Sequence, residues 1–500
     1  MRSASPIYKA GSNRTSARNT FPVRVLTLLL LFGAAAMYES VHLSSLADTD
    51  VWWHLRTGIW ILQNHAVPHN GVFSRFSTRP WSDASWGYDV LIAAVFKLLG
   101  LRAIPLLLMV LKVALAVSAF LLARGWGRNF WLAVSLAIAV QCALLALRPL
   151  PNLCSLVYFA IELALLFENR RTGNTRLLFW LPLLFVLWAN MHVQFVYGLI
   201  VLLMFLTAGL AGEVCHRSGV GWFDDVPALR LGVNGVVVAV CFCATLVSPY
   251  TYHLYQAVIE NASAVAYIAE HHAMNFRHPQ HYVLLLLAMA AFLSLGRRRS
   301  RDLFQITLMV ASAIVGFRME GDAGFLALAS VAVIADALSG AEIETQPGRR
   351  AHLGRLEVVA TAVLLLVAGV LSVSRIPSSR EELLNTVAKS FPVRASDYIH
   401  ENHLPNPLFN EYKWGGFLTW YLPDYPVAID GRRDLYGDEI NERYFALTNA
   451  EVPLSTDPVF LSAQTILLPA SSPMAEALAT FPDFKVLYRD DLAMVLVRQN

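Results

Sequence analysis

Two aspartates stand one residue apart in "LADTDVWWHL", residues 46–55, directly after an apolar run long enough to cross a membrane. Ionisable groups in or beside a bilayer are costly, which makes them candidates for a functional role. The carboxylate of Asp48 or Asp50 could take a proton from a hydroxyl or an amine as a general base. Either could also hold a divalent cation through oxygen. The structural alternative is that Asp50 caps a following helix, which leaves Asp48 unexplained.

Further polar residues stand at the ends of other apolar runs. Arg148 and Arg318 could hold a phosphate through forked hydrogen bonds. The alternative is that both arginines simply extend toward the membrane surface. The motif "WANMH" adds Trp188, Asn190 and His192. We expect these five residues to border a binding site.

Histidines fall near several of these motifs, and histidine is a common metal ligand. The neighbours His271 and His272 would diverge on a helix, and no HExxH motif is present. A zinc site is therefore not favoured. For His54 and His192, hydrogen bonding to a sugar or a phosphate is the preferred functional interpretation.

The composition indicates a membrane protein. Of the 500 residues, 56% are hydrophobic and only 15% are charged, and the mean hydropathy is +0.49. Ordinary soluble domains carry about 25% charged residues. A net charge of +3 is too small to indicate a nucleic-acid partner, and the five scattered cysteines imply no disulfide framework.

Hydropathy predicts about eleven membrane spans. They fall near residues 24–44, 103–123, 130–147, 152–167, 177–190, 194–212, 231–248, 281–296, 303–317, 323–338 and 356–374. The short apolar stretch 86–100 could be another span or a helix in the interface. Lys112 and Glu162 lie within spans, and a structural pair between them or extension toward the surface is preferred over a proton path.

The arginines favour an interfacial helix at 86–100, because the most basic loops then share one side with the tail 1–23. "GRRRSRD", residues 296–302, would otherwise lie outside. The positive-inside rule then predicts a multi-pass protein of the inner (plasma) membrane, with a cytoplasmic N-terminus. The polar motifs gather at the outer surface, as an outward-facing active site would require. The simpler alternative is that every polar loop must lie at one surface or the other.

The first outer loop, residues 46–102, begins with an amphipathic pattern. Val51, Leu55, Ile59 and Leu62 recur at helical spacing after Asp50. This predicts a helix that lies on the bilayer with its tryptophans at headgroup level.

Residues 375–500 differ in composition and predict a small extracytoplasmic α/β domain. We expect helices at 380–391 and 393–403, and strands at 426–430, 465–469 and 493–497. The pair Gly415-Gly416 predicts close backbone packing. Asp430, Arg432 and Asp434 could bind an acceptor, although a structural role is preferred.

Taken together, "ADTDVWWHL", "RP" at 148–149, "WANMH", Arg318, "LFNEYKWGGFLTWYL" and "PVAIDGRRDLYG" resemble a large bacterial group of multi-spanning proteins. That group is similar to the GT-C glycosyltransferases, which use polyprenol-phosphate sugars and include protein mannosyltransferases and the lipid A aminoarabinose transferase. The resemblance covers nearly the whole chain and implies a GT-C-like transmembrane domain at 24–374. It also implies that the catalytic base is a first-loop acid, Asp48 or Asp50. The second acid usual in a later outer loop is absent from "RPLPN", and Glu320 or Asp322 is the candidate replacement.

These observations predict an α-helical polytopic membrane glycosyltransferase that moves a sugar from a polyprenyl-phosphate donor to an envelope glycan, lipid or protein. Arg148 and Arg318 would hold the donor phosphate. The residues that would shape the pocket are His54, Trp188, Asn190 and His192. The expected partners are the lipid-linked donor, membrane lipid and the acceptor, and no cofactor is required, although a divalent cation stays an open alternative. A non-catalytic envelope scaffold and a transporter are the rival interpretations, and a transporter would need polar groups at mid-membrane and internal repeats.

Overall fold

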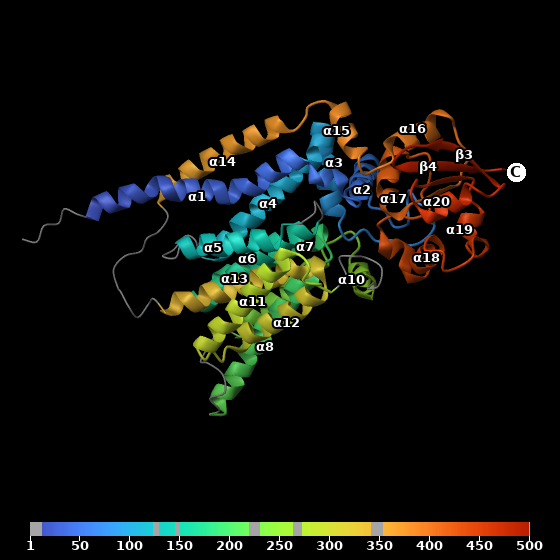
Figure 1. The fold of residues 1–500 in the computed structure, drawn as a ribbon. Helices are drawn as coiled ribbons and strands as arrows, with labels where there is room; N and C mark the ends of the chain where they lie inside the picture. Colours follow the sequence, from blue (N-terminus) through green and yellow to red (C-terminus); the bar gives the residue numbers. More distant parts are fainter. Residues whose placement is uncertain are drawn as a thin grey trace, which may run out of the picture.

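The computed structural model describes residues 13–123, 130–145, 151–219, 231–263, 273–341 and 354–499. It consists of a helical bundle with a mixed α/β domain at one end (Figure 1). The helices of the bundle and its first loop are α1 (Asn13–His42), α2 (Val51–Asn64), α3 (Trp86–Leu99), α4 (Ala103–Leu122), α5 (Phe130–Ala143), α6 (Asn152–Thr172), α7 (Leu181–Met191), α8 (Phe195–Arg217), α9 (Leu231–Thr245), α10 (His253–Ser263), α11 (Pro279–Arg297), α12 (Leu303–Arg318), α13 (Ala323–Ala341) and α14 (Arg355–Arg375).

Among the described residues, seven helical segments are long and apolar enough to cross a membrane, and four apolar helices are shorter. These segments coincide with the stretches that hydropathy predicted. The prediction of a polytopic helical membrane fold is therefore confirmed, while the number of helices that actually cross stays a prediction.

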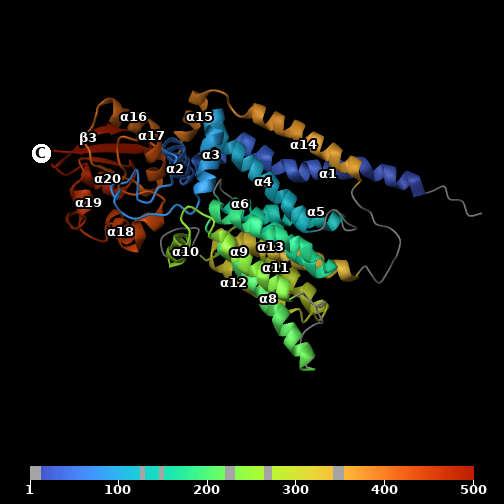
Figure 2. The ribbon, with the colours of Figure 1, turned by 180° about the vertical axis from the view of Figure 1, so that it is seen from behind.

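The helix α13 forms the centre of the bundle, because 83% of its apolar window is buried. It packs against α5, α6, α11 and α12. A helix that is apolar all round must be covered on every side, by protein or by lipid. In contrast, α14 is 17% buried and lies alongside α1 at the edge of the bundle (Figures 1 and 2), where lipid would cover the rest.

The helices α2 and α3 form a closely packed hairpin. Gly58 allows this approach, because a Cβ at that position would lie 1.8 Å from the backbone oxygen of Asp89. A break follows α3, where Gly100 has φ +58 and a short 3-10 turn leads into α4. The stretch 86–100 is therefore a separate helix from α4, and whether it crosses the membrane or lies in the interface stays a prediction.

The environment of α2 differs from the expected bilayer surface. Trp52 is fully buried, and its ring packs against Phe391, Phe417 and Trp420 of the C-terminal domain. An amphipathic pattern predicts only that one helix face needs apolar cover. Here the protein itself supplies that cover, so the placement of Trp52 at headgroup level is wrong.

Lys112 and Glu162 do not pair with each other. Lys112 lies over the ring of Tyr38, 5.9 Å from its centroid, and it interacts electrostatically with Glu39. Glu162 on α6 is fully buried, and its carboxylate oxygens accept no hydrogen bond from the part of the chain that the structure describes. The predicted pair is wrong because the two side chains face different neighbours.

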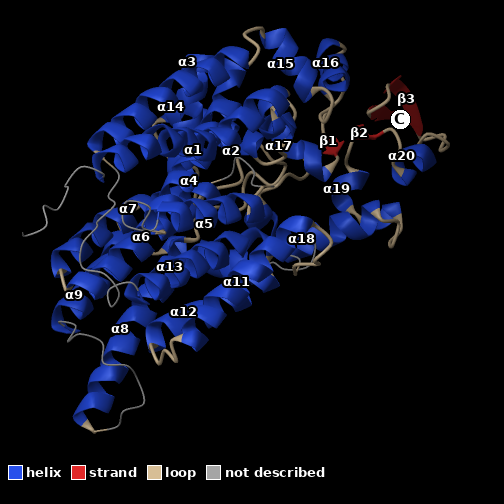
Figure 3. Cartoon of the chain, turned by 60° about the vertical axis from the view of Figure 1, so that its left-hand side comes forward, coloured by secondary structure: helices blue, strands red, loops and turns tan. Residues whose placement is uncertain are grey.

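The C-terminal domain is built on one sheet of four strands in the described residues, with the order β1-β2-β4-β3. Figure 3 colours the strands of this sheet red. β1 runs parallel to β2, and the other neighbours are antiparallel. Its elements are α15 (Arg380–Val387), α16 (Val393–Glu401), β1 (Leu408–Asn410), α17 (Tyr412–Tyr421), α18 (Arg433–Thr448), α19 (Pro458–Leu461), β2 (Thr465–Pro469), α20 (Pro473–Leu478), β3 (Phe484–Arg489) and β4 (Ala493–Arg498).

Most of the predicted elements of this domain are present, namely two helices and two of the three strands. The expected strand at 426–430 is wrong: that segment makes only an isolated bridge between Val427 and Ser74. Gly415 does pack closely, since a Cβ there would lie 2.0 Å from the Ile429 oxygen. The pairing of Val427 with Ser74 already shows that the first loop and the C-terminal domain are joined.

Candidate functional site

The side chain of Asp48, not that of Asp50, caps the helix α2. Its Oδ1 accepts hydrogen bonds from the backbone N–H groups of Asp50 and Val51, each at 2.9 Å. The side chain of Asp50 makes no such bond. Asp50 therefore occupies the N-cap position of α2, as predicted, but the side chain that accepts the capping hydrogen bonds is that of Asp48.

Asp50 faces the C-terminal domain instead. A Cβ at Gly431 would lie 2.0 Å from Oδ1 of Asp50, so any larger residue there would require the Asp50 carboxylate to move. Gly416 makes a similar approach, with its Cβ position 2.6 Å from the Thr49 oxygen. The first turn of α2 is thus set directly against two glycines of the C-terminal domain.

His54 forms a buried pair with Asp89 across the α2–α3 hairpin. Its Nδ1 lies 2.6 Å from Oδ1 of Asp89, and both residues are almost completely buried. Burial lowers the pKa of His54 to about 4, although the carboxyls of Asp83, Asp48 and Asp434 oppose the shift. The ring is therefore neutral near pH 7. If the Asp89 carboxylate accepts the hydrogen bond, the proton lies on Nδ1 and leaves Nε2 as an acceptor.

A second carboxyl, Asp83, lies against Asp89. It is buried, its Oδ1 accepts the N–H of Ser85 at 2.9 Å, and its side chain is within hydrogen-bond reach of Asp89. Burial and the neighbouring carboxyl raise the pKa of Asp83 well above its usual range. Two carboxyls so placed cannot both ionise easily, and they favour sharing one proton.

The C-terminal domain completes the cluster. Asp434 is half-buried and accepts a hydrogen bond from Nε1 of Trp81 at 2.9 Å. Burial raises its pKa to about 6, although Trp81 and Arg432 oppose the shift. We call Asp48, His54, Asp83, Asp89 and Asp434 the acid–histidine cluster.

Arg432 anchors this arrangement from within. It is 1% exposed, pairs with Asp430 at 2.7 Å, and donates a hydrogen bond to the backbone oxygen of Val72 at 2.8 Å. Its guanidinium also lies over the ring of Trp81, 4.9 Å from the centroid. Asp430 and Arg432 thus have the structural role that was preferred for them.

The motif at the end of α7 borders the cluster. Trp188 Nε1 donates to Oγ of Ser155 at 2.9 Å, and His192 Nδ1 lies 3.0 Å from the same hydroxyl. Burial lowers the pKa of His192 to about 3, and charge on His54 lowers it further, which places the two histidines within electrostatic reach.

Asn190 links three elements. Its Oδ1 accepts from Nε1 of Trp86 at 2.8 Å, and its Nδ2 donates to the oxygens of Val186 and Val247. The side chain therefore ties the start of α3 to α7 and to the chain after α9. This is a structural contact that supports the cluster from the bundle side.

The two arginines expected to hold phosphate are not brought together with these acids by the described contacts. Arg148 lies outside the described residues, and Arg318 is exposed at the end of α12. The nearby acids already have partners. Asp322 accepts from Gln194 and Tyr197, each at 2.7 Å, and Glu320 lies 3.1 Å from His281.

Sequence reasoning missed Asp83 and Asp89. Asp89 could have been found, because it is an acid inside the apolar stretch 86–100, where an ionisable group is unusual. Asp83 carries no comparable signal. Across the described ranges, no group of three or more His, Cys, Asp or Glu side chains is arranged to hold a metal ion. We therefore derive no step through a divalent cation.

Solved structures with the same fold identify the class of architecture. The oligosaccharyltransferase AglB from Archaeoglobus fulgidus, in complex with an inhibitory peptide and a dolichol-phosphate, matches with a TM-score of 0.56 at 12% identity, over 90% of this chain and 70% of that chain. The apo form of the Archaeoglobus fulgidus oligosaccharyltransferase matches with a TM-score of 0.53 at 11% identity, over 91% and 70%. The chain therefore shares its fold with these two oligosaccharyltransferase structures.

Another similar structure is ArnT from Cupriavidus metallidurans bound to undecaprenyl phosphate, with a TM-score of 0.43 at 14% identity over 97% of this chain and 98% of that chain. No protein-family model matches the chain, and no curated protein matches it.

Proposed function

We propose that this protein is a membrane glycosyltransferase. It moves a sugar from a polyprenyl-phosphate donor to a glycan, lipid or protein acceptor on the outer side of the membrane. The observation that carries the proposal is the acid–histidine cluster, in which Asp48 is fixed at the start of α2. The GT-C-like fold supports it, and so does the dolichol-phosphate named in one structure of similar fold.

In this mechanism the acceptor oxygen or nitrogen attacks the anomeric carbon of the donor sugar. The bond between that carbon and the phosphate oxygen breaks, and the polyprenyl phosphate leaves with the electron pair. The acceptor proton passes to a carboxylate, for which Asp48 and Asp50 are the two candidates. Proton removal by a positioned group typically contributes about 100-fold to 10,000-fold in rate.

The other residues have supporting roles. His54, within the cluster, is held by Asp89, and His192, beside it, is held by Ser155; both rings are neutral hydrogen-bonding groups. Trp188 and Asn190 fix the end of α7. Arg318 and Arg148 are proposed to hold the donor phosphate, since arginine binds phosphate oxygens in a forked geometry.

The alternative function is a non-catalytic envelope scaffold. One observation favours it: Asp48 caps α2 and Asp50 packs against Gly431, so both acids have structural contacts. A transporter is less favoured, because the two ionisable groups at mid-bundle, Lys112 and Glu162, do not form a shared polar path.

A transfer assay tests the proposal. The full-length protein in lipid vesicles is given polyprenyl phosphates that carry radiolabelled sugars, together with an envelope extract. A transferase gives a labelled product whose amount rises with protein concentration. Absence of product from every donor, with protein that is folded by its thermal unfolding profile, would favour the scaffold.

A further inference from the structure

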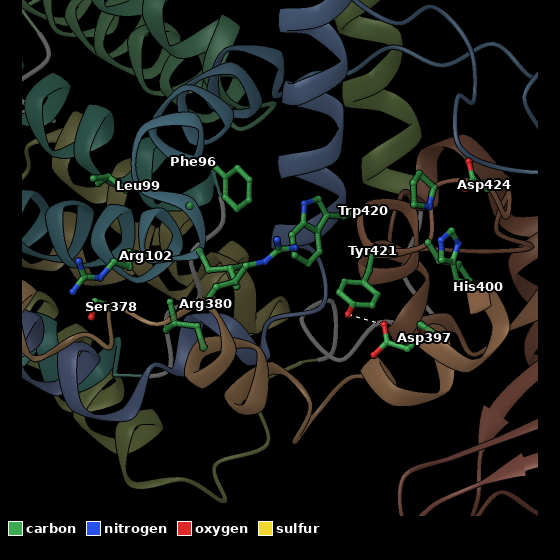
Figure 4. A pocket seen from close by; sticks show the side chains of 16 residues that line it. Phe96, Leu99, Arg102, Ser378, Arg380, Asp397, His400, Trp420, Tyr421 and Asp424 are labelled. Atoms are coloured by element: carbon green, nitrogen blue, oxygen red, sulfur yellow. Dashed lines mark hydrogen bonds between the residues drawn. The ribbon is translucent and has the colours of Figure 1, made fainter. Parts of the chain in front are cut away.

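A cavity of about 720 Å³ lies where the helical bundle meets the C-terminal domain (Figure 4). Its walls come from the corner between α3 and α4, from the chain entering α15, and from α16 and α17. Asp48, Asp50 and His54 are not part of its lining. Trp420 lines it and also stacks on the buried Trp52 at 4.9 Å. No residue of the acid–histidine cluster lines the cavity, so the two sites are separate.

One wall of the cavity is apolar and continues onto an exposed apolar edge. Phe96 and Leu99 of α3 face Trp420, with the rings of Phe96 and Trp420 6.1 Å apart. Leu98, next along α3, is 82% exposed. An exposed leucine at the end of a helix that leads into a membrane span is where acyl chains would cover the protein.

The rest of the cavity lining carries charges of both signs. The guanidinium of Arg102 donates hydrogen bonds to the backbone oxygens of Ile376 and Pro377 at 2.6 and 3.0 Å, and these bonds fix its position. Arg380 is exposed at the first residue of α15. Arg102 stands at the corner between α3 and α4, and Arg380 stands on α15; both are labelled in Figure 4.

The carboxylates stand on the side of the C-terminal domain. Asp397 accepts a hydrogen bond from the hydroxyl of Tyr421 at 2.9 Å, and Asp424 lies further along the same wall (Figure 4). The ring of Trp420 stands between the two sets of charges. The cavity thus offers two cations, two carboxylates and aromatic faces beside an apolar edge.

We propose that this cavity binds the head of a zwitterionic phospholipid that carries a phosphate and a primary ammonium group. The phosphate lies against Arg102 and Arg380, since guanidinium groups bind phosphate oxygens strongly. The ammonium group lies against Asp397 and the rings of Trp420 and Tyr421, which suit a cation. The acyl chains follow Phe96 and Leu99 to the exposed Leu98. A wholly anionic head would satisfy the arginines but would be repelled by the carboxylates.

The test measures lipid binding to the full-length protein, delipidated in detergent, with phosphatidylethanolamine that is fluorescently labelled on an acyl chain. Unlabelled phosphatidylethanolamine, phosphatidylglycerol and undecaprenyl phosphate compete for the site. We expect phosphatidylethanolamine to compete at least fivefold better than phosphatidylglycerol. We also expect undecaprenyl phosphate not to displace the labelled lipid at equal concentration.

Two variants and two matched controls locate the site. Arg380→Gln and Asp397→Asn should each weaken phosphatidylethanolamine binding at least fivefold. Arg394→Gln and Glu401→Gln remove exposed charges of the same signs from α16, outside the cavity lining, and should leave binding unchanged. Thermal unfolding profiles verify that each variant is folded.

Three results would overturn the proposal. One is equal binding in Arg380→Gln, Asp397→Asn and the wild type. Another is phosphatidylglycerol that competes as well as phosphatidylethanolamine. The third is displacement by undecaprenyl phosphate, which would assign the cavity to the sugar donor rather than to a membrane phospholipid.

Discussion

At the scale of single residues, the two neighbouring aspartates have different structural tasks. Asp48 accepts two amide hydrogen bonds at the start of α2, whereas Asp50 contacts the backbone of Gly431. Proximity in sequence therefore does not make them equivalent. Their effects on stability and on activity can be separated experimentally.

Loss of the helix cap should be visible in stability. Asp48→Ala removes both hydrogen bonds to the first turn of α2 and should cost about 1 kcal/mol, within the usual range for cap residues. Asp50→Ala removes no cap and should cost less. Thermal unfolding of the purified variants in detergent measures the difference, and a larger loss for Asp50→Ala would contradict this assignment.

The His54 ring should make the protein acid-sensitive. Its pKa falls from 6.5 to about 4 on folding, so the folded protein holds the neutral ring and the unfolded chain binds the proton more readily. The stability due to this group is complete above pH 6.5 and is lost as the pH falls toward 4. The loss can reach about 1.4 kcal/mol per pH unit in that window.

Asp434 also titrates in this range: its pKa is raised to about 6, so its contribution to stability increases as the pH falls. That contribution is present in both the wild type and His54→Gln, so the difference between the two proteins reports the effect of His54. We expect the stability of the wild type to fall more steeply than that of His54→Gln between pH 6.5 and pH 4.5. Parallel unfolding midpoints across that range would argue against a buried neutral ring.

At the scale of elements, the hairpin of α2 and α3 depends on a single glycine. Gly58→Ala puts a methyl group 1.8 Å from the Asp89 oxygen, which forces the two helices apart and strains the His54–Asp89 contact. The unfolding midpoint should fall markedly, since overpacking typically costs about 1–3 kcal/mol. The control is Gly33→Ala on α1, where no atom lies within 4 Å of the added Cβ; a loss of equal size there would make the effect of Gly58→Ala nonspecific.

The helices of the bundle were predictable from sequence because each apolar run carries its own signal. The partner of α2 was not. Its apolar face is covered by Phe391, Phe417 and Trp420, more than 300 residues further along the chain, and local periodicity cannot distinguish that surface from a bilayer. For the same reason the sequence could not show that Asp434 interacts electrostatically with His54.

At the scale of the whole molecule, the first loop and the C-terminal domain form one packed unit. Val72 and Trp81 of the loop contact Arg432, and Trp81 also contacts Asp434. The sequence predicted the two regions separately, and its motifs predicted a fold that the solved oligosaccharyltransferase structures share. It could not show that the candidate site lies where these two regions meet.

This unit should depend on the buried pair of Arg432 and Asp430. Arg432→Met leaves Asp430 buried without its cation, and the loss of one partner of such a pair typically costs about 3–5 kcal/mol. We expect limited proteolysis to cut the C-terminal domain of Arg432→Met faster than that of the wild type. Arg394→Met, which changes an exposed arginine, should be cut at the wild-type rate, and equal rates for all three proteins would contradict the role of the pair.

The central claim is that a first-loop carboxylate acts in the chemical step, and the most direct measurement compares binding with turnover in Asp48→Asn and Asp50→Asn. Donor affinity and the rate of sugar transfer are measured on the same purified proteins, with Glu381→Gln on α15 as an exposed control. The account predicts that one of the two variants binds donor within about threefold of the wild type yet transfers sugar at least about 100-fold more slowly. Transfer at the wild-type rate by both variants would contradict it and would leave the two aspartates with their structural contacts alone.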